Sequence, residues 1–595
     1  MGTECAQNMR GWYAQESPEK ETGTRLVKMR VWASERGRVL GVSALVGLTA
    51  LAVYAATAQR GISWQDSGEY QYKFLAEAYD WEVGAGIARL HPTYILLTRL
   101  LAACLPWVGV PYVYTLSSGV GMALALAVLV LTVYGMTRSL RAGCLAAVLL
   151  GGAHMAWWLS TMAEVYTWSL ALLMLELACL MKTLRERSFA WFAGAIFFNG
   201  FHFGVHHFAL LNLPVYAVLF WLLFRRKAWH WGACAVLWLF GALPIVIPIV
   251  RYWVASGSLE AVIQSALFGE VFQQKILALD VRKGPLWRAN MALASVSFMN
   301  PCWLYAAVVP LVAWWEWRMR GRTSNAERRT PNAERRTSNV ERRTQNAEVE
   351  NGKNAQLPTL NAQRSSTGTG GASVCLPENA ERRTSNAERR SGAALLALTV
   401  LHAFFWVRYL VPDQATFLLP TLGLLAVWAG VGAARVLRER RGWFAPSVAV
   451  SLACSVLAPH AVCRTAERLL PPRSRVLPFR DEFAYWAYPW KHNENSAERF
   501  VEAVARERYP EGMVVWADTT AVAPLMAAQA MGRLPASWRW LSYWQNEEDE
   551  VIIQRLQASP DGGYVVSPLR CYVPEAILEQ AQSFERRGVL HRIVW

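Results

Sequence analysis

Residues 39 to 58 read VLGVSALVGLTALAVYAATA, an apolar run without a single charge. A helix of about 20 residues is about 30 Å long, which is the thickness of the hydrocarbon core of a bilayer. The run therefore predicts a membrane-spanning helix. Its N-terminal flank is long and polar, unlike that of a cleaved signal peptide, and predicts an uncleaved anchor.

The same pattern recurs along the chain. Ten further apolar runs bring the candidate spans to eleven, at 112–134, 141–158, 165–181, 189–205, 208–224, 230–250, 302–316, 392–411, 415–434 and 443–460. Only 17% of the 595 residues are charged, against about 25% in soluble proteins. Many of the 29 Trp residues flank apolar runs, where amphipathic rings reach the headgroups. We therefore expect a mainly α, polytopic transmembrane helical bundle.

The charges between the spans predict an orientation. Basic residues mark the N-terminal flank and every second later loop, whereas the alternate loops are short or acidic. Because cytoplasmic loops carry the excess of Lys and Arg, the N-terminus is predicted to be cytoplasmic and the C-terminus to lie outside. The short apolar segment from Pro92 to Leu105 contains Arg99, and we assign it to the outer surface rather than to a span.

Five parts follow from this topology. They are a cytoplasmic N-terminal segment (1–38), an N-terminal transmembrane module with the first outer loop (39–317), an Arg-rich cytoplasmic insertion (318–391), C-terminal transmembrane helices (392–460) and an extracytoplasmic α/β domain (461–595). The last is indicated by strand-like runs at 513–517 and 564–566 and helix-like runs at 497–508 and 551–556.

The insertion repeats Asn-Ala-Glu-Arg-Arg-Thr-Ser with a period of seven in 323–348, and the unit returns at 379–391. It has no apolar pair at a and d positions, so it cannot form a coiled-coil seam. Its composition predicts disorder. About half of the net charge of +16 comes from this loop and the rest flanks the spans, which is the topology pattern and not that of a nucleic-acid-binding surface.

Ionisable and aromatic residues gather in the loops assigned to the outer side. They are Asp66, Glu69, Arg89, His91, Glu164, Tyr166, His206, His207, Arg408 and Asp413. Ionisable groups at membrane depth are costly and usually mark a site. Because these come from separate helices but share one face, we expect a single polar pocket.

Structural interpretations exist for several of them. Asp66 and Glu69 have the D-x-x-E spacing of a capping box. Glu164 could simply favour the positive N-terminal end of a helix. His91 before Pro92 could be an N-cap followed by Pro at the first helical position.

The remaining motifs are equally open. His206 and His207 could be interfacial histidines with satisfied hydrogen bonds, and adjacent side chains on a helix point about 100° apart, which makes a metal site weak. Arg408 and Asp413 could be a structural pair that flanks a tight outer turn. The shared sidedness of all these residues favours function.

Taken in order, the motifs resemble a known family. They are Asp66-Ser67-Gly68-Glu69 just after the first span, His91-Pro92, Ala163-Glu164-Val165-Tyr166, Gly204 to His207 followed by Leu-Asn-Leu-Pro, and Pro412-Asp413 with Leu419-Pro420. The chain resembles a bacterial domain-of-unknown-function family related to protein O-mannosyltransferases, within the GT-C class of membrane glycosyltransferases. The resemblance covers 39–250 well and 392–434 moderately. The Arg-rich repeat and residues 87–90 before His91 depart from it.

The resemblance implies a reaction and its partners. A GT-C enzyme takes a sugar from a polyprenyl phosphate, here at the outer face of a bacterial inner membrane, and gives it to a hydroxyl of a protein or glycan. Asp66 is then the candidate base, with Glu69 and Glu164 as further catalytic carboxylates. A carboxylate within hydrogen-bond reach would take the proton of the poorly nucleophilic hydroxyl.

The donor and acceptor would need binding residues. The lipid phosphate needs positive charge, for which Arg89, His206, His207 and Arg408 are candidates; His91, Tyr166 and Asp413 complete the expected substrate-binding set. We expect no cofactor; a divalent metal on Asp66 and Glu69 is the alternative, because two carboxylates suit a hard cation.

Two other functions compete with an enzyme. A transporter or flippase for a lipid-linked glycan would need polar groups on both sides of the midplane, and apart from Glu176 the sequence places them mainly on the outer side. A non-enzymatic scaffold that displays the C-terminal domain would leave the outer carboxylates without a role.

Overall fold

The computed structural model describes residues 18–76, 86–268, 284–308, 310–312, 378–409, 411, 413–469, 476–542 and 548–595. The N-terminal module begins with α1 (Pro18–Thr57), α2 (Gln65–Leu75), η1 (Ile87–Arg89), α3 (Pro92–Cys104), α4 (Val110–Thr137), α5 (Leu140–Gly151), α6 (His154–Ser160) and α7 (Tyr166–Glu186). It continues with α8 (Phe189–Phe203), η2 (His207–Asn212), α9 (Leu213–Phe224), α10 (Ala228–Gly241), α11 (Leu243–Ser256), α12 (Leu259–Ile263), the π-helical turn η3 (Gln264–Phe268), α14 (Pro285–Val296) and η4 (Pro301–Leu304).

The C-terminal membrane helices are α16 (Glu378–Arg408), η5 (Gln414–Leu418), α17 (Leu419–Glu439), η6 (Arg441–Trp443) and α18 (Phe444–Leu469). Seven helices among the described residues are long and apolar enough to cross a bilayer, and three bent pairs raise the number to ten. The shorter apolar helix α8 corresponds to the remaining predicted span. The prediction of a polytopic helical bundle is confirmed.

Burial separates the centre of the bundle from its rim. The most apolar windows of α4, α7 and the η5–α17 segment are 72%, 83% and 83% buried, whereas those of α1, α16 and α18 are only 22–28% buried. Leu45 and Leu48 of α1 and Phe404 of α16 are about two-thirds exposed, at 64%, 65% and 65%. Such apolar outer faces are those of helices that meet lipid.

Three predicted spans have a different shape. The helices at 141–158 and 230–250 are broken by bends of 72° and 82°, and the third bend lies at the predicted 302–316 span. Residues 287–296 and 301–312 are two apolar helices bent by 92° at a short break, instead of one span over 302–316. Asn300 caps the second helix by accepting a hydrogen bond from the Cys302 backbone N–H, and Pro301 begins it. Residues 313–316 lie outside the described residues.

The Arg-rich insertion ends earlier than the sequence predicts. Helix α16 begins at Glu378, so residues 378–391, which were assigned to a disordered loop, are helical. Their composition explains this, because Ala, Glu and Arg are strong helix formers and the preceding turns extend a spanning helix. The earlier part of the insertion, 318–377, lies outside the described residues.

The C-terminal region is an α/β domain, as predicted. A five-stranded sheet has the order β2-β1-β3-β5-β4, with β1 (Val514–Trp516) parallel to β2 (Arg539–Leu541) and β3 (Tyr564–Val565) and with β4 (Ser583–Arg587) and β5 (Leu590–Val594) antiparallel. Its helices are α19 (Glu482–Ala487), α20 (Ser496–Arg506), α21 (Thr519–Ala530), α22 (Asp549–Gln557) and α23 (Glu575–Gln580), with the turn η8 (Pro560–Gly562). Val515 and Trp516 are fully buried and anchor β1, which lies between β2 and β3.

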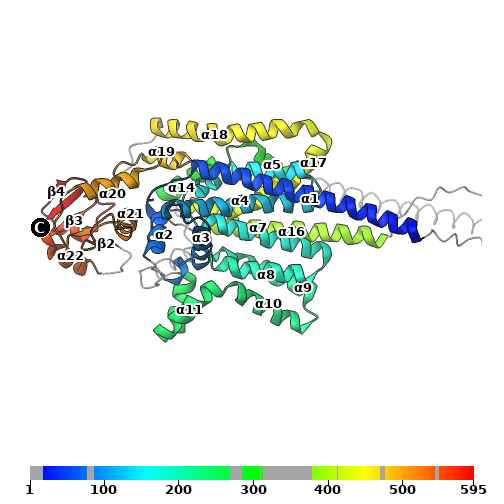
Figure 1. Cartoon of the computed structure of the whole chain (residues 1–595), viewed down its shortest axis with the longest axis horizontal. Coiled ribbons are helices and arrows are strands. Elements are labelled where there is room, and N and C mark those ends of the chain that lie inside the picture. Colours follow the sequence, from blue (N-terminus) through cyan, green and yellow to red (C-terminus); the bar gives the residue numbers. More distant parts are fainter. Residues whose placement is uncertain are drawn as a thin grey trace, which may run out of the picture.

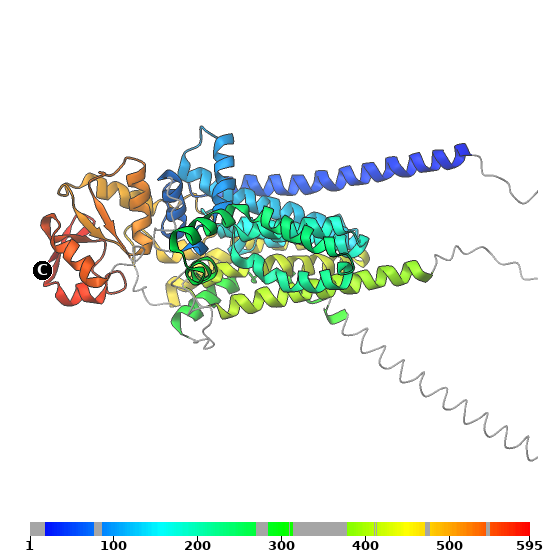
Figure 2. The same ribbon diagram turned by 90° about the horizontal axis from the view of Figure 1, so that it is seen from below.

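The domain covers one end of the bundle, and α2 lies between the two (Figures 1 and 2). The 13-residue α3 also lies at this end, across the bundle, and is too short to span, as predicted. The beginnings of α1 and α16 project from the opposite end (Figure 2). The motifs assigned to one side of the membrane are therefore together at the end that carries the C-terminal domain.

Candidate functional site

Helix α2 presents Asp66 and Glu69 at the junction of bundle and domain. The helix begins at Gln65, and its N-cap is Trp64, which makes no side-chain capping bond. Asp66 lies in the first turn, so the capping-box interpretation of the D-x-x-E motif is wrong. Gln65 has a φ of +57°, a left-handed conformation that is uncommon outside glycine. This conformation turns the chain sharply where it enters α2.

The C-terminal domain packs against α2 and the residues just before it. Trp64 Nε1 donates to Ser496 Oγ at 2.7 Å, and its ring lies against Phe500 at 5.3 Å between centroids. The Ile62 backbone N–H donates to Glu498 Oε2 at 3.0 Å. Gly68 faces α21 so closely that a Cβ there would meet the Ser63 carbonyl oxygen at 2.2 Å and the Ala523 methyl at 3.0 Å. Glycine is required at this position by space.

Two cations flank Glu69. Lys73, one helical turn later, places Nζ 2.6 Å from Glu69 Oε1, and Arg89 places a guanidinium nitrogen 2.7 Å from Oε2. The same Arg89 atom is 3.5 Å from Asp66 Oδ1. The Glu69 side chain is only 7% exposed, whereas that of Asp66 is 48% exposed. Asp66 is thus the carboxylate of the pair that a substrate can reach.

The surroundings separate the pKa values of these two carboxyl groups. Burial acts to raise the pKa of Glu69, but the Arg89 and Lys73 cations outweigh it and the pKa is lowered. Although half of its side chain is open, desolvation by the packed surroundings raises the pKa of Asp66 to about 6, and Arg89 limits the rise. Glu69 therefore stays ionised, while Asp66 can exchange a proton near neutral pH.

Glu164 adds a third carboxyl group from the loop between α6 and α7. Ser67 Oγ donates to Glu164 Oε1 at 2.9 Å, and Ser118 Oγ of α4 bonds both the backbone N–H and the carbonyl of Glu164. Burial, and then the nearby Asp66 charge, raise the pKa of Glu164 well above its ordinary value. Glu164 lies directly before Val165, the N-cap of α7, and its carboxylate accepts a hydrogen bond from Ser67 of α2.

Asp413, directly before η5, is the fourth carboxyl group of the cluster. Tyr166 OH donates to Asp413 Oδ2 at 3.0 Å, and Thr416 Oγ1 donates to the Asp413 carbonyl at 2.8 Å. Burial raises the pKa of Asp413, and the Tyr166 hydrogen bond opposes the rise. Arg408 is the last residue of α16, just before this turn. The charges of Glu69, Asp413 and Arg89 act on the pKa of Asp66, and those of Asp66, Asp413 and Glu69 act on the pKa of Glu164.

The histidines differ from the expected cationic role. His91 Nδ1 bonds the Val205 carbonyl at 2.7 Å, and its ring stacks on His206 at 5.7 Å. Burial lowers the pKa of His91 to about 3, and it lowers that of His206 well below its ordinary value. His206 is therefore neutral and supplies no positive charge to a phosphate. His207 turns away to pack against Phe203 at 5.1 Å.

A divalent metal between the two carboxylates of α2 would compete with the guanidinium of Arg89. Arg89 bridges Asp66 and Glu69, at the position where a shared divalent cation would lie. Within the described part of the chain no three His, Cys, Asp or Glu side chains converge on one point.

Sequence reasoning missed three side chains of this cluster. Lys73 could have been found, because Glu69 and Lys73 have the i,i+4 spacing of a helical ion pair. Ser118 and Tyr70 carried no such signal, since they read as an ordinary small residue in a span and an ordinary core aromatic. Tyr70 is buried between the rings of His91 and Tyr94.

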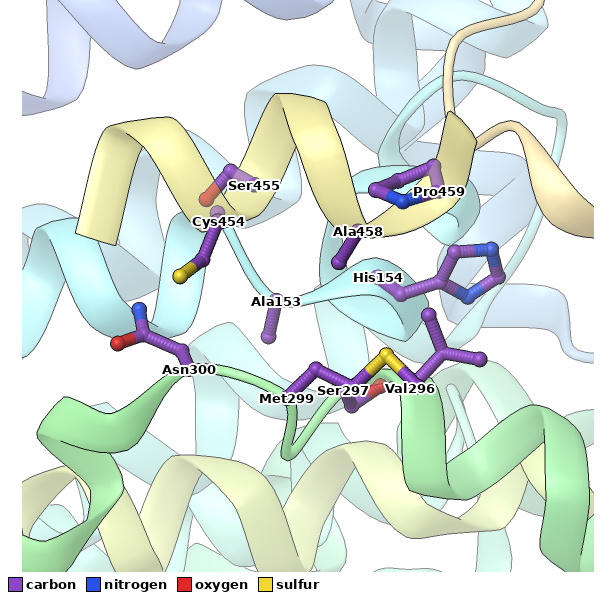
Figure 3. A pocket seen from close by; sticks show the side chains of 11 residues that line it. Ala153, His154, Val296, Ser297, Met299, Asn300, Cys454, Ser455, Ala458 and Pro459 are labelled. Carbon is purple, nitrogen blue, oxygen red and sulfur yellow. The ribbon is translucent and has the colours of Figure 1, made fainter. Parts of the chain in front are cut away.

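Cavities outside the cluster are unlike a sugar site. Figure 3 shows one at the break between α5 and α6, where Ala153 and His154 face Ser297 and Met299 and the Cys454 to Pro459 stretch of α18. Its volume of about 10 Å³ holds about one water molecule. A larger groove of about 540 Å³ lies along η4, with Trp303 and Leu304 in its mainly apolar lining.

Comparisons with known proteins identify the fold. No family model matches the chain, and no curated protein does. Among solved structures, the crystal structure of ArnT from Cupriavidus metallidurans bound to undecaprenyl phosphate is similar, with a TM-score of 0.50 and 14% identity. The match covers 92% of this chain and 97% of that one. The structure of the same ArnT in the apo state matches with a TM-score of 0.47, 13% identity and the same coverage. The likeness extends over bundle and C-terminal domain alike, so the chain has the fold of ArnT.

Proposed function

We propose that the protein is a GT-C glycosyltransferase that moves a sugar from a polyprenyl phosphate to a hydroxyl group on the extracytoplasmic side. One observation carries the proposal: Asp66 is a half-exposed carboxylate with a pKa near 6, held beside buried carboxyl groups at the domain end of the bundle. The fold supports the class, because ArnT is a GT-C membrane glycosyltransferase and its similar structure contains undecaprenyl phosphate. The motifs that resemble the O-mannosyltransferase-related family favour a protein or glycan hydroxyl as acceptor.

In the proposed mechanism Asp66 acts as the base. The acceptor oxygen forms a bond to C1 of the sugar while Asp66 takes its proton, and the bond from C1 to the phosphate oxygen breaks with its electron pair leaving on the phosphate. A single displacement of this kind inverts the configuration at C1. Phosphate is a sufficiently stable leaving group that the protein's contribution is mainly positioning and charge.

The neighbours of Asp66 have separate tasks in this mechanism. Arg89 and Lys73 fix Glu69, which in turn fixes the guanidinium beside Asp66. Burial raises the pKa of Glu164 well above its ordinary value, which favours the protonated form that can donate a hydrogen bond to a substrate oxygen. Arg408 is a candidate cation for the lipid phosphate, because it ends α16 just before the turn that holds Asp413 and its guanidinium can bind phosphate oxygens.

The transporter alternative is weakened by the surroundings of Glu176. This residue is fully buried between α7, α8 and α9, and its carboxylate accepts from Asn199, Asn212 and Tyr216 and contacts His202 Nδ1 at 2.7 Å. Such a saturated network ties these helices together, and it gives Glu176 a structural role in place of the transport role that the alternative required.

The scaffold alternative predicts a freely displayed C-terminal domain. Instead, the domain packs its helices α20 and α21 against Trp64 and Gly68 of the α2 region. A domain built onto the carboxylate-bearing helix is expected in an enzyme whose site lies at that junction.

The test of the proposed function is release of sugar. Detergent-purified protein would be incubated with a panel of undecaprenyl-phosphate hexoses and with acceptor peptides and glycans, and free undecaprenyl phosphate and glycosylated acceptor would be quantified. We expect at least one donor to be turned over. Absence of both binding and turnover across the panel contradicts the proposal.

The proposed orientation has its own test. Single cysteines at Gly61 and Glu585, at the domain end, should react with an impermeant thiol reagent in intact cells, and one at Arg226 in the α9–α10 loop should not. The reverse pattern would place the carboxylate cluster in the cytoplasm and contradict the proposed donor.

A further inference from the structure

The stacked rings of His91 and His206 form an unexplained feature of the cluster. His91 has a φ of +46° just before α3, a left-handed conformation that costs free energy for a residue with a Cβ. Its Nδ1 bond to the Val205 carbonyl holds the ring in place, parallel to that of His206 within 19°. Backbone strain retained at such a position indicates that the placement of this ring matters.

Backbone partners fix which nitrogen carries the proton in each ring. The carbonyl of Val205 can only accept, so His91 Nδ1 carries the hydrogen and Nε2 of the neutral ring is an acceptor. His206 Nδ1 accepts from the Phe208 N–H at 3.2 Å and caps η2, so the hydrogen of the neutral ring is on Nε2. The two rings therefore present opposite hydrogen-bonding edges, one acceptor and one donor.

Charging His206 would break its cap, because a proton on Nδ1 would face the Phe208 N–H. This geometric constraint agrees with the burial that lowers the pKa of both rings. Among the described residues only the Nδ1 atoms of the two rings have hydrogen-bond partners, and neither Nε2 is among the buried polar atoms that lack one, so both Nε2 atoms keep some exposure. Both edges are thus available to a ligand.

His91 and His206 lie with Tyr70 and Tyr166 in an aromatic wall beside the carboxylate cluster. His91 meets the edge of Tyr70 at 5.8 Å, and His206 lies 5.4 Å from the ring of Tyr166, whose hydroxyl donates to Asp413. His91 is also close enough to Glu69 to influence the pKa of that residue. A ligand at Asp66 would therefore lie beside two neutral imidazoles and two phenol rings.

We propose that His91 and His206 act as a neutral acceptor–donor pair that binds hydroxyl groups of the transferred sugar, and that they do not bind its phosphate. The proposal rests on the proposed glycosyltransferase function and names the part of the donor that these residues bind. A sugar hydroxyl both donates and accepts a hydrogen bond, which matches one Nε2 lone pair and one Nε2–H. A phosphate oxygen only accepts and prefers cationic donors.

The experiment compares binding of undecaprenyl phosphate with binding of undecaprenyl-phosphate hexoses to the detergent-purified full chain. His206→Phe keeps a ring in the aromatic wall and removes the Nε2 donor. His91→Asn removes the Nε2 acceptor, and Asn tolerates the left-handed backbone and can still reach Val205. His460→Phe in α18, outside the cluster, is the control for a histidine-to-phenylalanine change.

Each variant should weaken binding of the hexose lipid that the wild type prefers by about 2- to 10-fold, the value of one neutral hydrogen bond, and leave the sugar-free lipid within about 2-fold. Equal losses for both lipids, or no loss for either, overturn the assignment of the pair while leaving the glycosyltransferase proposal intact. A wild type that binds none of these lipids contradicts both proposals.

A second measurement does not depend on turnover. Nitrogen-15 spectra of histidine-labelled protein at pH 7, assigned with the same variants, should show the Nδ1–H form for His91 and the Nε2–H form for His206. An imidazolium signal from either ring, or the opposite tautomer, overturns the acceptor–donor pair.

Discussion

Replacing Gly68 by alanine should displace the helix that carries Asp66. The new Cβ would lie 2.2 Å from the Ser63 carbonyl oxygen, and contacts of this kind are essentially never closer than 3.0 Å, so α2 must move by about 0.8 Å. The Ser63 backbone cannot easily yield, because its N–H is bound to Gln71 Oε1 at 3.0 Å. We expect a destabilisation of about 1–3 kcal/mol. A shift of about 1 Å at a reacting group can lower its rate about 10²-fold.

The assay combines sugar release, thermal unfolding and hydrogen exchange of residues 62–75 in purified protein. Gly135→Ala is the matched control, because it also lies in a helix but nothing is within 4 Å of its Cβ; it should stabilise the protein by about 0.5–1 kcal/mol. Ala523→Gly should not rescue Gly68→Ala, since it leaves the Ser63 carbonyl in place. Full activity and unchanged exchange in Gly68→Ala would refute the claim that this close contact positions α2.

Three further predictions concern charges around α2. The kcat/KM for transfer should rise with pH through a midpoint near 6, because Asp66 must lose its proton to act as a base; a flat profile from pH 5 to 8 would contradict this. Arg89→Gln removes the cation that limits that pKa, so the midpoint should move to higher pH, and loss of the Glu69 ion pair should cost about 1–3 kcal/mol by thermal unfolding; an unmoved midpoint would count against the pairing. Glu498→Ala removes the acceptor of the Ile62 N–H, so it should speed hydrogen exchange at Ile62 and lower kcat more than it raises KM. Glu498→Gln keeps an acceptor for that N–H and should largely restore the exchange rate and kcat. Equal behaviour of the two variants would contradict the role of the bond.

The membrane architecture could be predicted because lipid imposes a simple pattern. Charge-free runs such as 39–58 and 112–134 give their helices directly, since a chain in hydrocarbon must satisfy its backbone internally. The predictions were wrong where a local signal competes with this pattern. The Asn300-Pro301 break bends the expected 302–316 span, and the strong helix formers of 378–391 extend α16 into the expected loop.

The sequence predicted which carboxyl groups lie close together better than it predicted what each of them contacts. Sidedness alone placed Asp66, Glu69, Glu164 and Asp413 at one end, where the structure brings them together. The pairing of Arg89 with Glu69 was not predictable, because the two residues are 20 positions apart and no periodicity of the sequence links them. The neutral state of His206 follows from its burial, and its tautomer follows from a hydrogen bond donated by the Phe208 backbone; a sequence shows neither.

The packing of the C-terminal domain against α2 could not be predicted from the sequence either. Trp64 and Ser496 are 432 positions apart, and each is compatible with many partners. Only the folded arrangement shows that the C-terminal domain supports the carboxylate-bearing helix.

The central claim is that Asp66 is the base, and Asp66→Asn tests it most directly. Asn keeps the shape of the side chain, and Asp66 neither caps α2 nor is deeply buried, so the protein should remain folded. Asp481→Asn, at the N-cap of α19, is the matched control for the chemical change. With the donor turned over by the wild type, Asp66→Asn should bind the lipid normally but transfer sugar about 10²- to 10⁴-fold more slowly, while Asp481→Asn stays near the wild-type rate. Near-normal transfer by Asp66→Asn, with melting behaviour matched to the wild type, would contradict the account and direct attention to Glu164.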